Sequence, residues 1–310
     1  MKTRSPRRGV RMSASLTRRI SIMSMPMEMI TAETEIARAG FAWREGEGGV
    51  RALVCEPLEG EGFPNAFSTR GGGVSPFPEN SLNLAGFDED SAENIRENRR
   101  RLIRLLGGEW TLAACWQVHG LEVRVVRDAE DTQSEREHCD ALTTRAPGVL
   151  LGVKTADCVP VLLADARRGA CAAVHAGWRG TLAGIAGRAL ERMRDEFGTD
   201  PAEVSAAIGP AARACCYEVG AEVVNAFRAK FPNADSLFTP THDGHALVDI
   251  QLANRQQLVE AGVAAGRVHT LPLCTICRPE LFFSYRREKR LYGRTGRLLS
   301  VIGMRNADSS

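Results

Sequence analysis

Three residues whose types could do chemistry together are His119, Cys158 and His175. Two imidazoles and a thiolate are the nitrogen and sulfur donors that zinc prefers, and three protein ligands leave a fourth position for water or substrate. The set therefore predicts a catalytic zinc site. A second hypothesis needs only Cys158 as nucleophile and His175 as base, in a metal-free hydrolase or amidase. The two hypotheses differ in whether His119 is required.

The placement of Cys158 and His175 is predicted from the two apolar runs that they flank, residues 159–163 and 170–174. The runs are rich in β-forming residues and are separated by ADARRG, whose Asp and Gly favour a turn, so they predict an antiparallel hairpin. If Asp165 pairs with Arg168, Cys158 faces His175 directly. Opposed Cβ atoms in such a ladder lie about 5 Å apart, close enough for the two side chains to share a metal ion or a proton. A slip of one residue would separate them onto opposite faces.

The residues after His175 predict an anion site. AGWRGTLAGIAGRALERMRDEFG reads as a glycine turn followed by a helix over about 181–197. The free N–H groups at the start of that helix, with Arg179 beside them, would attract an anion close to His175.

The remaining elements are expected to form a mixed α/β domain of the α+β type. Ser91 is the expected N-cap of a helix over 91–108, which ends at two glycines. No short repeat or long linker interrupts the chain, so a single domain is expected over 31–305. Further expected strands cover 50–58, 121–126, 204–210 and 298–304, and further helices cover 219–231 and 252–263.

Composition excludes two classes of partner. The 310 residues carry a net charge of +2, but seven basic residues and no acid lie within 1–27, so 28–310 carry −5. This acidic body predicts no nucleic-acid partner, and the absence of an apolar stretch of about 20 residues predicts no membrane span. Nine cysteines in a chain of this length do not resemble a secreted disulfide framework, so a reducing, cytoplasmic setting is expected.

The two ends of the chain are expected to lie outside the domain. Residues 1–30 contain several methionines, which favours a disordered or mis-started extension over a targeting presequence. Residues 306–310 are expected to be a loose tail.

Several other residues are candidates with a structural alternative. Cys274 and Cys277 form a lone CxxC, which is either a redox or metal pair or, as we expect in the absence of a second CxxC, two packed thiols near the site. The adjacent Cys215 and Cys216 are expected to be structural. Asp157 is either a general base or a group that orients a ligand histidine. Trp116 and Trp178 either stack on a substrate or pack in the core. Arg286, Arg287 and Arg297 either line a cleft or form surface ion pairs with Glu280 and Glu288.

Nine motifs that contain most of these candidate residues make the chain resemble a known family. The motifs are FSTRGGGVS (67–75), SLNLA (81–85), WQVHG (116–120), DALTT (140–144), TADCVPVLL (155–163), HAGWRG (175–180), IGPAARACCYEVG (208–220), CTICRPELFFSYRRE (274–288) and TGRLLSVIG (295–303). In this order, over about 63–305, they are similar to the laccase-domain family, also called the polyphenol oxidase or YfiH-like family. His138 and Cys139 have no counterpart in the resemblance and are assigned no role.

The resemblance implies a fold, an activity and a site. The fold would be a four-layer α/β/β/α arrangement similar to the catalytic domain of certain deamidating toxins. The activity would be that of a zinc-dependent purine nucleoside phosphorylase with adenosine deaminase activity, acting on purine nucleosides and phosphate. The zinc ligands would be His119, Cys158 and His175, with Arg70 as a phosphate contact.

Chemical reasoning adds to this hypothesis and sets it against two others. Asn83 could orient ribose or phosphate, and Arg70 and Arg179 could clamp an anion with their planar guanidinium groups. The metal-free Cys/His hydrolase would act on a cell-wall precursor amide. A copper-dependent polyphenol oxidase is disfavoured because the chain has 6 histidines and no His-x-His pair, although a zinc site can capture copper adventitiously.

Overall fold

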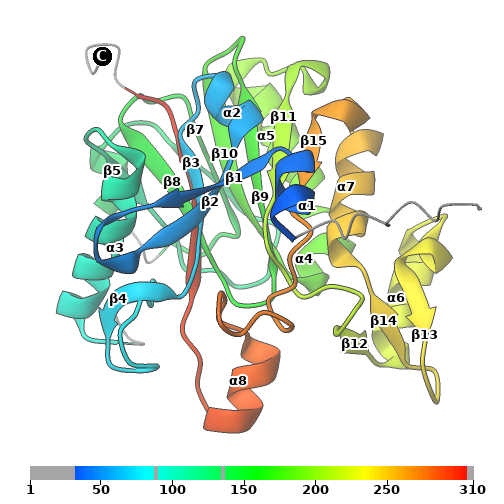
Figure 1. The fold of residues 1–310 in the computed structure, drawn as a ribbon. Helices are drawn as coiled ribbons and strands as arrows, with labels where there is room; N and C mark the ends of the chain where they lie inside the picture. The colour runs from blue at the N-terminus through cyan, green and yellow to red at the C-terminus, as the bar shows by residue number, and fades with distance from the viewer. Residues whose placement is uncertain (1–31, 87–89, 134–136, 306–310) are drawn as a thin grey trace, which may run out of the picture. The chain divides into compact units, whose positions relative to one another are not determined.

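Two six-stranded sheets form the centre of the fold in the computed structural model (Figure 1). The structure describes residues 32–86, 90–133 and 137–305, so the expectations for 1–30 and for 306–310 lie outside the described residues. The described residues belong to one compact unit, Ala32–Ser310.

The first sheet is antiparallel except where β5 pairs with β8. Its strands are, in spatial order, β1 (Phe41–Glu45), β2 (Arg51–Cys55), β3 (Asn65–Ser68), β16 (Leu298–Gly303), β8 (Val149–Thr155) and β5 (Thr111–Ala113).

The second sheet is antiparallel at its centre and has a parallel pair at each edge. Its strands are, in spatial order, β15 (Val268–Thr270), β11 (Ser205–Ile208), β9 (Val159–Asp165), β10 (Ala170–Ala176), β7 (Ala141–Thr144) and β6 (Val123–Val126).

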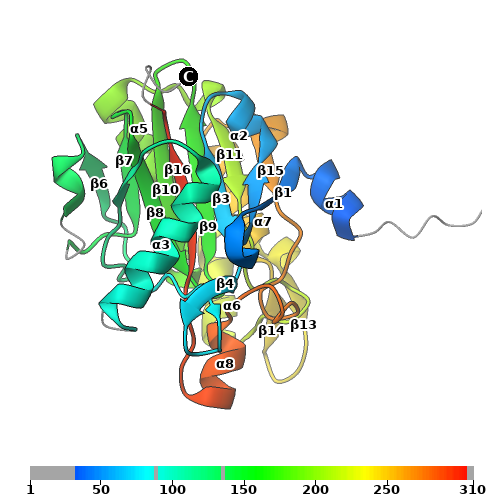
Figure 2. The same ribbon diagram turned by 60° about the vertical axis from the view of Figure 1, so that its left-hand side comes forward.

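Smaller elements complete the fold. A three-stranded sheet contains β12 (Glu218–Val219), β14 (Ala246–Val248) and β13 (Phe238–Pro240), and β4 (Gly71–Ser75) lies outside the three sheets. The α-helices are α1 (Ala32–Arg38), α2 (Glu56–Gly60), α3 (Ala92–Leu106), α4 (Trp178–Ala183), α5 (Ile185–Phe197), α6 (Ala221–Lys230), α7 (Ile250–Glu260) and α8 (Tyr285–Tyr292). Both α8 and the small sheet lie near the same end of the large sheets (Figures 1 and 2).

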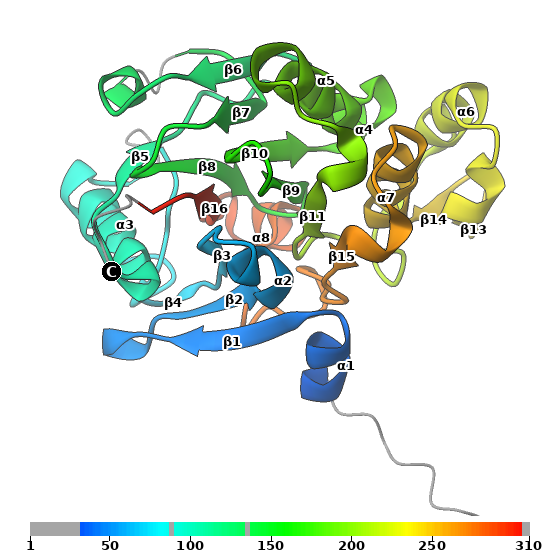
Figure 3. The same ribbon diagram turned by 90° about the horizontal axis from the view of Figure 1, so that it is seen from above.

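The strands of the two large sheets are apolar on both faces. One face of each sheet packs against the other sheet, and the opposite face packs against an outer layer that contains helices. In β8, Leu151 packs between the two sheets, whereas its neighbour Leu150 packs outward against Leu102 of α3. In β9, Leu162 faces the space between the sheets and Leu163 faces the outer layer that contains α5. Figure 3 shows α3 and α5 on opposite sides of the paired sheets. The layer order is therefore α/β/β/α, which confirms the expected mixed fold.

The hairpin of β9 and β10 is confirmed, and its register differs from the one considered in the sequence analysis. Asp165 pairs with Ala170, not with Arg168, because the loop contains four residues and ends at Gly169, whose φ is 60°. The backbone N–H of Arg168 donates to the Asp165 carboxylate at 3.1 Å and closes this longer turn. The register differs by two residues, so the side chains keep the predicted faces.

The helix predicted over 181–197 is two helices. Gly184 adopts a left-handed conformation, with φ 91° and ψ 32°, and separates α4 from α5. Its N–H donates to the carbonyls of Gly180 and Thr181, which ends α4 as a glycine cap does. By contrast, the Ser91 cap of α3 is confirmed, since its hydroxyl accepts from the N–H of Asn94 at 3.2 Å.

Within the described ranges, no helix combines the length and the apolar character needed to cross a membrane.

Candidate metal centre and active-site cleft

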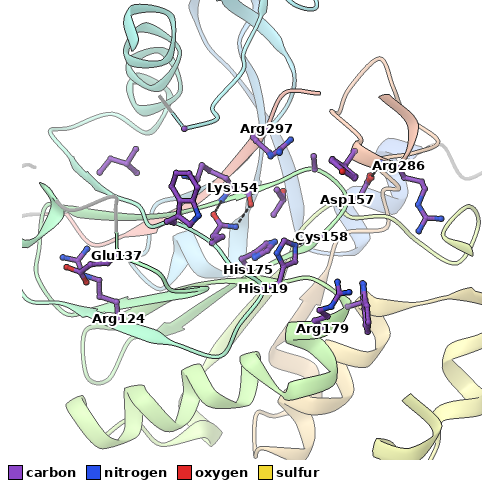
Figure 4. A pocket seen from close by; sticks show the side chains of 18 of the residues that line it. His119, Arg124, Glu137, Lys154, Asp157, Cys158, His175, Arg179, Arg286 and Arg297 are labelled. Carbon is purple, nitrogen blue, oxygen red and sulfur yellow. Dashed lines mark hydrogen bonds and ion pairs between the residues drawn. The ribbon is translucent and has the colours of Figure 1, made fainter. Parts of the chain in front are cut away.

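The structure brings His119, Cys158 and His175 together (Figure 4). One potential ligand atom from each lies within 4.8 Å of the others. Cys158 Sγ is 3.8 Å from Nε2 of His119, and the two imidazole rings are arranged edge to face with centroids 4.8 Å apart. His175 lies in β10, Cys158 directly precedes β9, and His119 lies in the loop between β5 and β6. In the observed register His175 pairs with Pro160, and Cys158 stands just beyond the ladder.

Asp140, directly before β7, is the organising residue of this group. Its fully buried carboxylate accepts hydrogen bonds from Nδ1 of His175 at 2.8 Å and from the backbone N–H groups of Val118, His119 and Gly120 at 3.2, 2.9 and 2.6 Å. One side chain thus holds both imidazole ligands. With Nδ1 occupied by Asp140, Nε2 is the nitrogen of His175 that remains for a metal ion.

The backbone around the ligands is locally constrained. His119 and Asp157 have φ of 61° and 92°, in the left-handed region that non-glycine residues rarely adopt. Gly177 is needed for space, because a methyl group on its Cα would lie 2.7 Å from Cδ2 of His119 and 3.1 Å from Cys158 Sγ. The glycine of the HAGWRG motif thereby allows β10 to continue into α4 directly beside the ligands.

The electrostatics favour the ligand form of the thiol. Burial would raise the pKa of Cys158, but the His175 charge and hydrogen bonds from both histidines lower it to about 6. Burial would lower the pKa of His175, but the charge of Cys158 and the hydrogen bond to Asp140 raise it to about 9. Without a metal ion the two groups thus stabilise each other's charged forms. The thiolate is the form of cysteine that binds metal, and a bound metal ion would take the place of the proton on Nε2 of His175. The donor set fits a soft or borderline divalent cation.

The ligands lie in a cleft with a volume of about 1520 Å³. Its walls combine aromatic rings with basic and acidic side chains. Aromatic faces suit a flat base, and the basic side chains suit an anion joined to it. The aromatic members are Trp116, Trp178, Tyr217 and Tyr285, and the basic members are Arg124, Lys154, Arg179, Arg286 and Arg297.

Two tryptophans named from the sequence line the cleft. Trp116 is 49% exposed, so it is not a core residue. Trp178 packs partly against the core and carries the guanidinium of Arg179 over its ring at 4.2 Å. Arg179 also lines the cleft, as the predicted anion contact requires.

Arg70 is not among the residues that line the cleft. Its guanidinium Nη1 donates at 2.7 Å to Glu288 and at 2.7 and 3.3 Å to the carbonyl oxygens of Pro279 and Phe282. Only 13% of its side chain is exposed. The observed contacts tie Arg70 to the segment before α8 and to α8 itself, so its predicted phosphate contact is not supported by the geometry.

Asn83 acts on the cleft through the backbone. Its Oδ1 accepts from the N–H of Arg297 at 2.9 Å and from the N–H of Ala85 at 3.2 Å, and it is 5% exposed. The structure therefore places Asn83 as a support for Arg297, which lines the cleft, rather than against ribose or phosphate.

Asp157 is not placed as an orienting group of a ligand histidine. Its carboxylate accepts from the hydroxyls of Thr275 and Ser284 at 2.6 and 3.0 Å and from the N–H of Arg286 at 2.6 Å. Burial raises its pKa, and these hydrogen bonds offset only part of that effect. Asp157 joins the start of β9 to the loop after β15 and to α8. Arg286 and Arg297 line the cleft, and Glu288 pairs with Arg70 instead of with an arginine of its own motif.

Sequence reasoning missed three residues of the site. Asp140 opens the DALTT motif but received no role, because its contacts with 118–120 and His175 depend on the fold. Gln117 and Lys154 line the cleft, and the Gln117 amide donates to the Lys154 carbonyl at 2.7 Å. Their positions inside WQVHG and directly before TADC were the available signals.

Four of the other cysteines form a second cluster. The sulfur atoms of Cys215, Cys216, Cys274 and Cys277 lie within 4.8 Å of one another. Cys215 and Cys277 are exposed. The expectation of packed thiols is therefore correct for Cys274, which is buried, and wrong for Cys277.

A four-layer α/β/β/α fold with a His/His/Cys group in an aromatic and basic cleft defines a class of protein equipped to bind a metal ion beside an organic substrate. The chain matches the family described as multi-copper polyphenol oxidoreductase laccase over residues 64–305, and it belongs to that family. Purine nucleoside phosphorylase YlmD of Geobacillus stearothermophilus is 37% identical over 263 residues, which are 82% of this chain and 94% of that protein.

Two further comparisons agree with this assignment. Adenosine deaminase RL5, from an unknown prokaryotic organism, is 38% identical over 239 residues, covering 74% of this chain and 91% of that protein. The crystal structure of YlmD from Geobacillus stearothermophilus superposes with a TM-score of 0.78 at 34% identity, covering 86% of this chain and 99% of that chain.

Proposed function

We propose that this chain is a zinc-dependent purine nucleoside phosphorylase with adenosine deaminase activity. It would cleave adenosine, inosine, guanosine or methylthioadenosine with phosphate to the free base and the (methylthio)ribose 1-phosphate. The observation that carries the proposal is the His119, Cys158 and His175 group, in a cleft that offers both aromatic and basic side chains. The names of the relatives supply the substrate class.

The three ligands would hold zinc and leave a position for a non-protein ligand. Bound there, zinc would act as a Lewis acid and ionise a water molecule near neutral pH, which is the chemistry of deamination. The contribution of this chain is orientation. Asp140 fixes which nitrogen of His175 remains for the metal and holds the loop that carries His119.

The cleft walls account for substrate recognition. The exposed ring of Trp116 offers a face on which a purine can stack. Phosphorolysis also needs a bound phosphate directed at C1′ of the ribose and polar groups that stabilise the departing base. We assign phosphate binding to Arg179, Arg286 and Arg297, because these arginines line the cleft and Arg70 does not.

The alternatives fit the geometry less well. A Cys158/His175 hydrolase does not need His119, yet His119 faces the sulfur at 3.8 Å and is held by the same carboxylate as His175. A copper oxidase of the multicopper type requires many clustered histidines, whereas only two of the 6 histidines join this group. A cytoplasmic location remains a prediction.

The test is product analysis of zinc-loaded protein incubated with adenosine, with and without phosphate. We expect adenine and ribose 1-phosphate only with phosphate, and inosine in both cases. His119→Ala should lower both activities by at least about 100-fold, more than the 10–100-fold typical of changes to groups that support a ligand. His242→Ala, which alters an exposed histidine outside the ligand group, is the matched control. Full activity in His119→Ala, or amide hydrolysis without purine products, would refute the proposal.

A further inference from the structure

The four clustered cysteines form a second group with the chemistry of a metal site. Cys216 Sγ lies 2.8 Å and Cys215 Sγ lies 3.3 Å from Cys277 Sγ, and all four sulfur atoms lie within 4.8 Å of one another. We propose that Cys215, Cys216, Cys274 and Cys277 bind a zinc ion as four thiolates, separately from the His119, Cys158 and His175 group.

The spacing fits the ion. Zinc–sulfur bonds of about 2.3 Å in a tetrahedron place the sulfur atoms about 3.8 Å apart. The observed separations, from 2.8 Å up to the 4.8 Å limit, bracket that value, so small side-chain rotations suffice. Zinc binding would displace the thiol protons, and the charge of the divalent ion would offset the mutual repulsion of the four thiolates.

The backbone presents the four sulfur atoms from two loops. Cys215 and Cys216 follow β11, and Cys274 and Cys277 follow β15, which runs parallel to β11. The two loops continue the pairing of these strands, because Ala211 forms a bridge with Cys274 and accepts a hydrogen bond from the N–H of Thr275 at 3.0 Å. Two cysteine pairs far apart in sequence are therefore held on adjacent, fixed loops.

The four cysteines reach from the core to the surface. Cys274 is 5% exposed, Cys216 is half-buried, and Cys215 and Cys277 are exposed. An ion can therefore enter the cluster from solvent, while the fold fixes its innermost ligand. Arg213 and Arg278, in the same two loops, are basic residues that can offset the net charge of a zinc tetrathiolate.

A disulfide explains the cluster less completely. One disulfide would join two of these cysteines and leave two thiols beside it, whereas a tetrahedral ion uses all four. Four protein ligands also leave no position for water, which is the arrangement of structural zinc sites. The ion would join the loop that carries Tyr217 to the loop that carries Thr275, the partner of Asp157. Its role would be to fix one wall of the cleft, not to take part in the reaction.

The test is metal counting by mass spectrometry on protein purified with a thiol reductant and zinc. We expect two zinc ions per wild-type chain. Cys277→Ser and Cys216→Ser should each retain only the zinc ion of the His119, Cys158 and His175 group. His119→Ala should retain only the zinc ion of the four-cysteine cluster. Cys171→Ala, which removes a buried cysteine from β10, should retain both and serves as the control for a changed thiol count.

Cobalt substitution identifies the ligands without reference to activity. Cobalt bound by four thiolates should show intense sulfur-to-cobalt charge-transfer absorption that survives in His119→Ala. In Cys277→Ser this absorption should fall, leaving mainly the weaker contribution of the single Cys158 thiolate in the other group. One zinc per wild-type chain that disappears in His119→Ala would overturn the proposal. So would peptide mapping that finds a Cys216–Cys277 disulfide in the reduced preparation. Because the two groups are emptied by different substitutions, failure here leaves the proposed function untouched.

Discussion

Two aspartates lie beside the ligand group. Asp140 accepts a hydrogen bond from His175, and Asp157 directly precedes Cys158 in the sequence. Both carboxylates accept several hydrogen bonds, yet their donors differ. All four donors to Asp140 are N–H groups, three of them from the backbone. Two of the three donors to Asp157 are the hydroxyls of Thr275 and Ser284.

This difference separates two kinds of support. A hydroxyl can rotate and become an acceptor, but an N–H group of the backbone cannot. The Asp140 side of the cleft therefore needs an acceptor at both carboxylate oxygens, and it holds two of the three residues that could bind a metal ion. The Asp157 side is adaptable, and it holds the cleft-lining segment at the start of α8.

The largest expected effect comes from exchanging the two carboxylates for amides. In Asp140→Asn the new NH₂ group would face N–H donors, so at least one buried donor would lose its partner, at a cost of about 1–3 kcal/mol. We expect zinc affinity and activity to fall about 10–100-fold. In Asp157→Asn the hydroxyls can turn to accept, so zinc affinity should change less than about twofold. Chelator competition measures both, and equal losses would remove the distinction.

The second largest effect tests zinc binding on the Asp140 side of the cleft alone. Gly177→Ala places a methyl group 2.7 Å from the ring of His119, while φ at this position, −70°, suits any residue. The ring must move, so we expect zinc affinity to fall at least about tenfold. Gly187→Ala is the matched control, since no atom lies within 4 Å of its added methyl group. That change should stabilise α5 by about 0.5–1 kcal/mol. Unchanged zinc binding in Gly177→Ala would show that the ring has room to move.

The third effect is expected on the Asp157 side. Ser284 donates to Asp157 and also caps α8, where it accepts from the N–H of Arg287 at 3.2 Å. Ser284→Ala should cost about 1 kcal/mol of stability and raise the KM for nucleoside a few-fold, with zinc content unchanged. Ser91→Ala removes the equivalent cap from α3 and should cost the same stability without changing KM. An equal rise in KM for both variants would mean that Ser284 acts only through stability.

The sequence predicted the elements well because local patterns determine them. The alternating and continuous apolar runs marked β9, β10 and β16, and Ser91 with its terminal glycines marked α3. The register of the hairpin could not be predicted, since turns of two and of four residues preserve the same alternation. The break at Gly184 was missed because α4 and α5 together show one helical pattern.

The grouping of His119, Cys158 and His175 was predicted from the sequence, but the carboxylate of Asp140 that holds the two histidines was not. His119, Cys158 and His175 are donors by type, whereas Asp140 matters only because β7 lies beside β10. Arg70 shows the same limit of sequence reasoning. The family resemblance implies a phosphate contact for it, whereas its observed partner is Glu288, 218 positions later, which only the fold brings close.

The smallest expected effect is on the pH dependence of folding stability. The contributions of Asp140 and Asp157 should change with pH in opposite directions. Burial would raise the pKa of Asp140, but its hydrogen bonds with His175 and the 118–120 loop lower it, so its stabilisation is present above about pH 4 and is lost on acidification. The pKa of Asp157 is raised by burial, so its stabilisation is present below about pH 4 and is lost as the pH rises. In urea unfolding of metal-free protein between about pH 3 and 6, the advantage of wild type over Asp140→Asn should therefore grow with pH. Its advantage over Asp157→Asn should shrink. Parallel slopes would show that the two carboxylates have the same electrostatic environment, contrary to the comparison drawn from their donors.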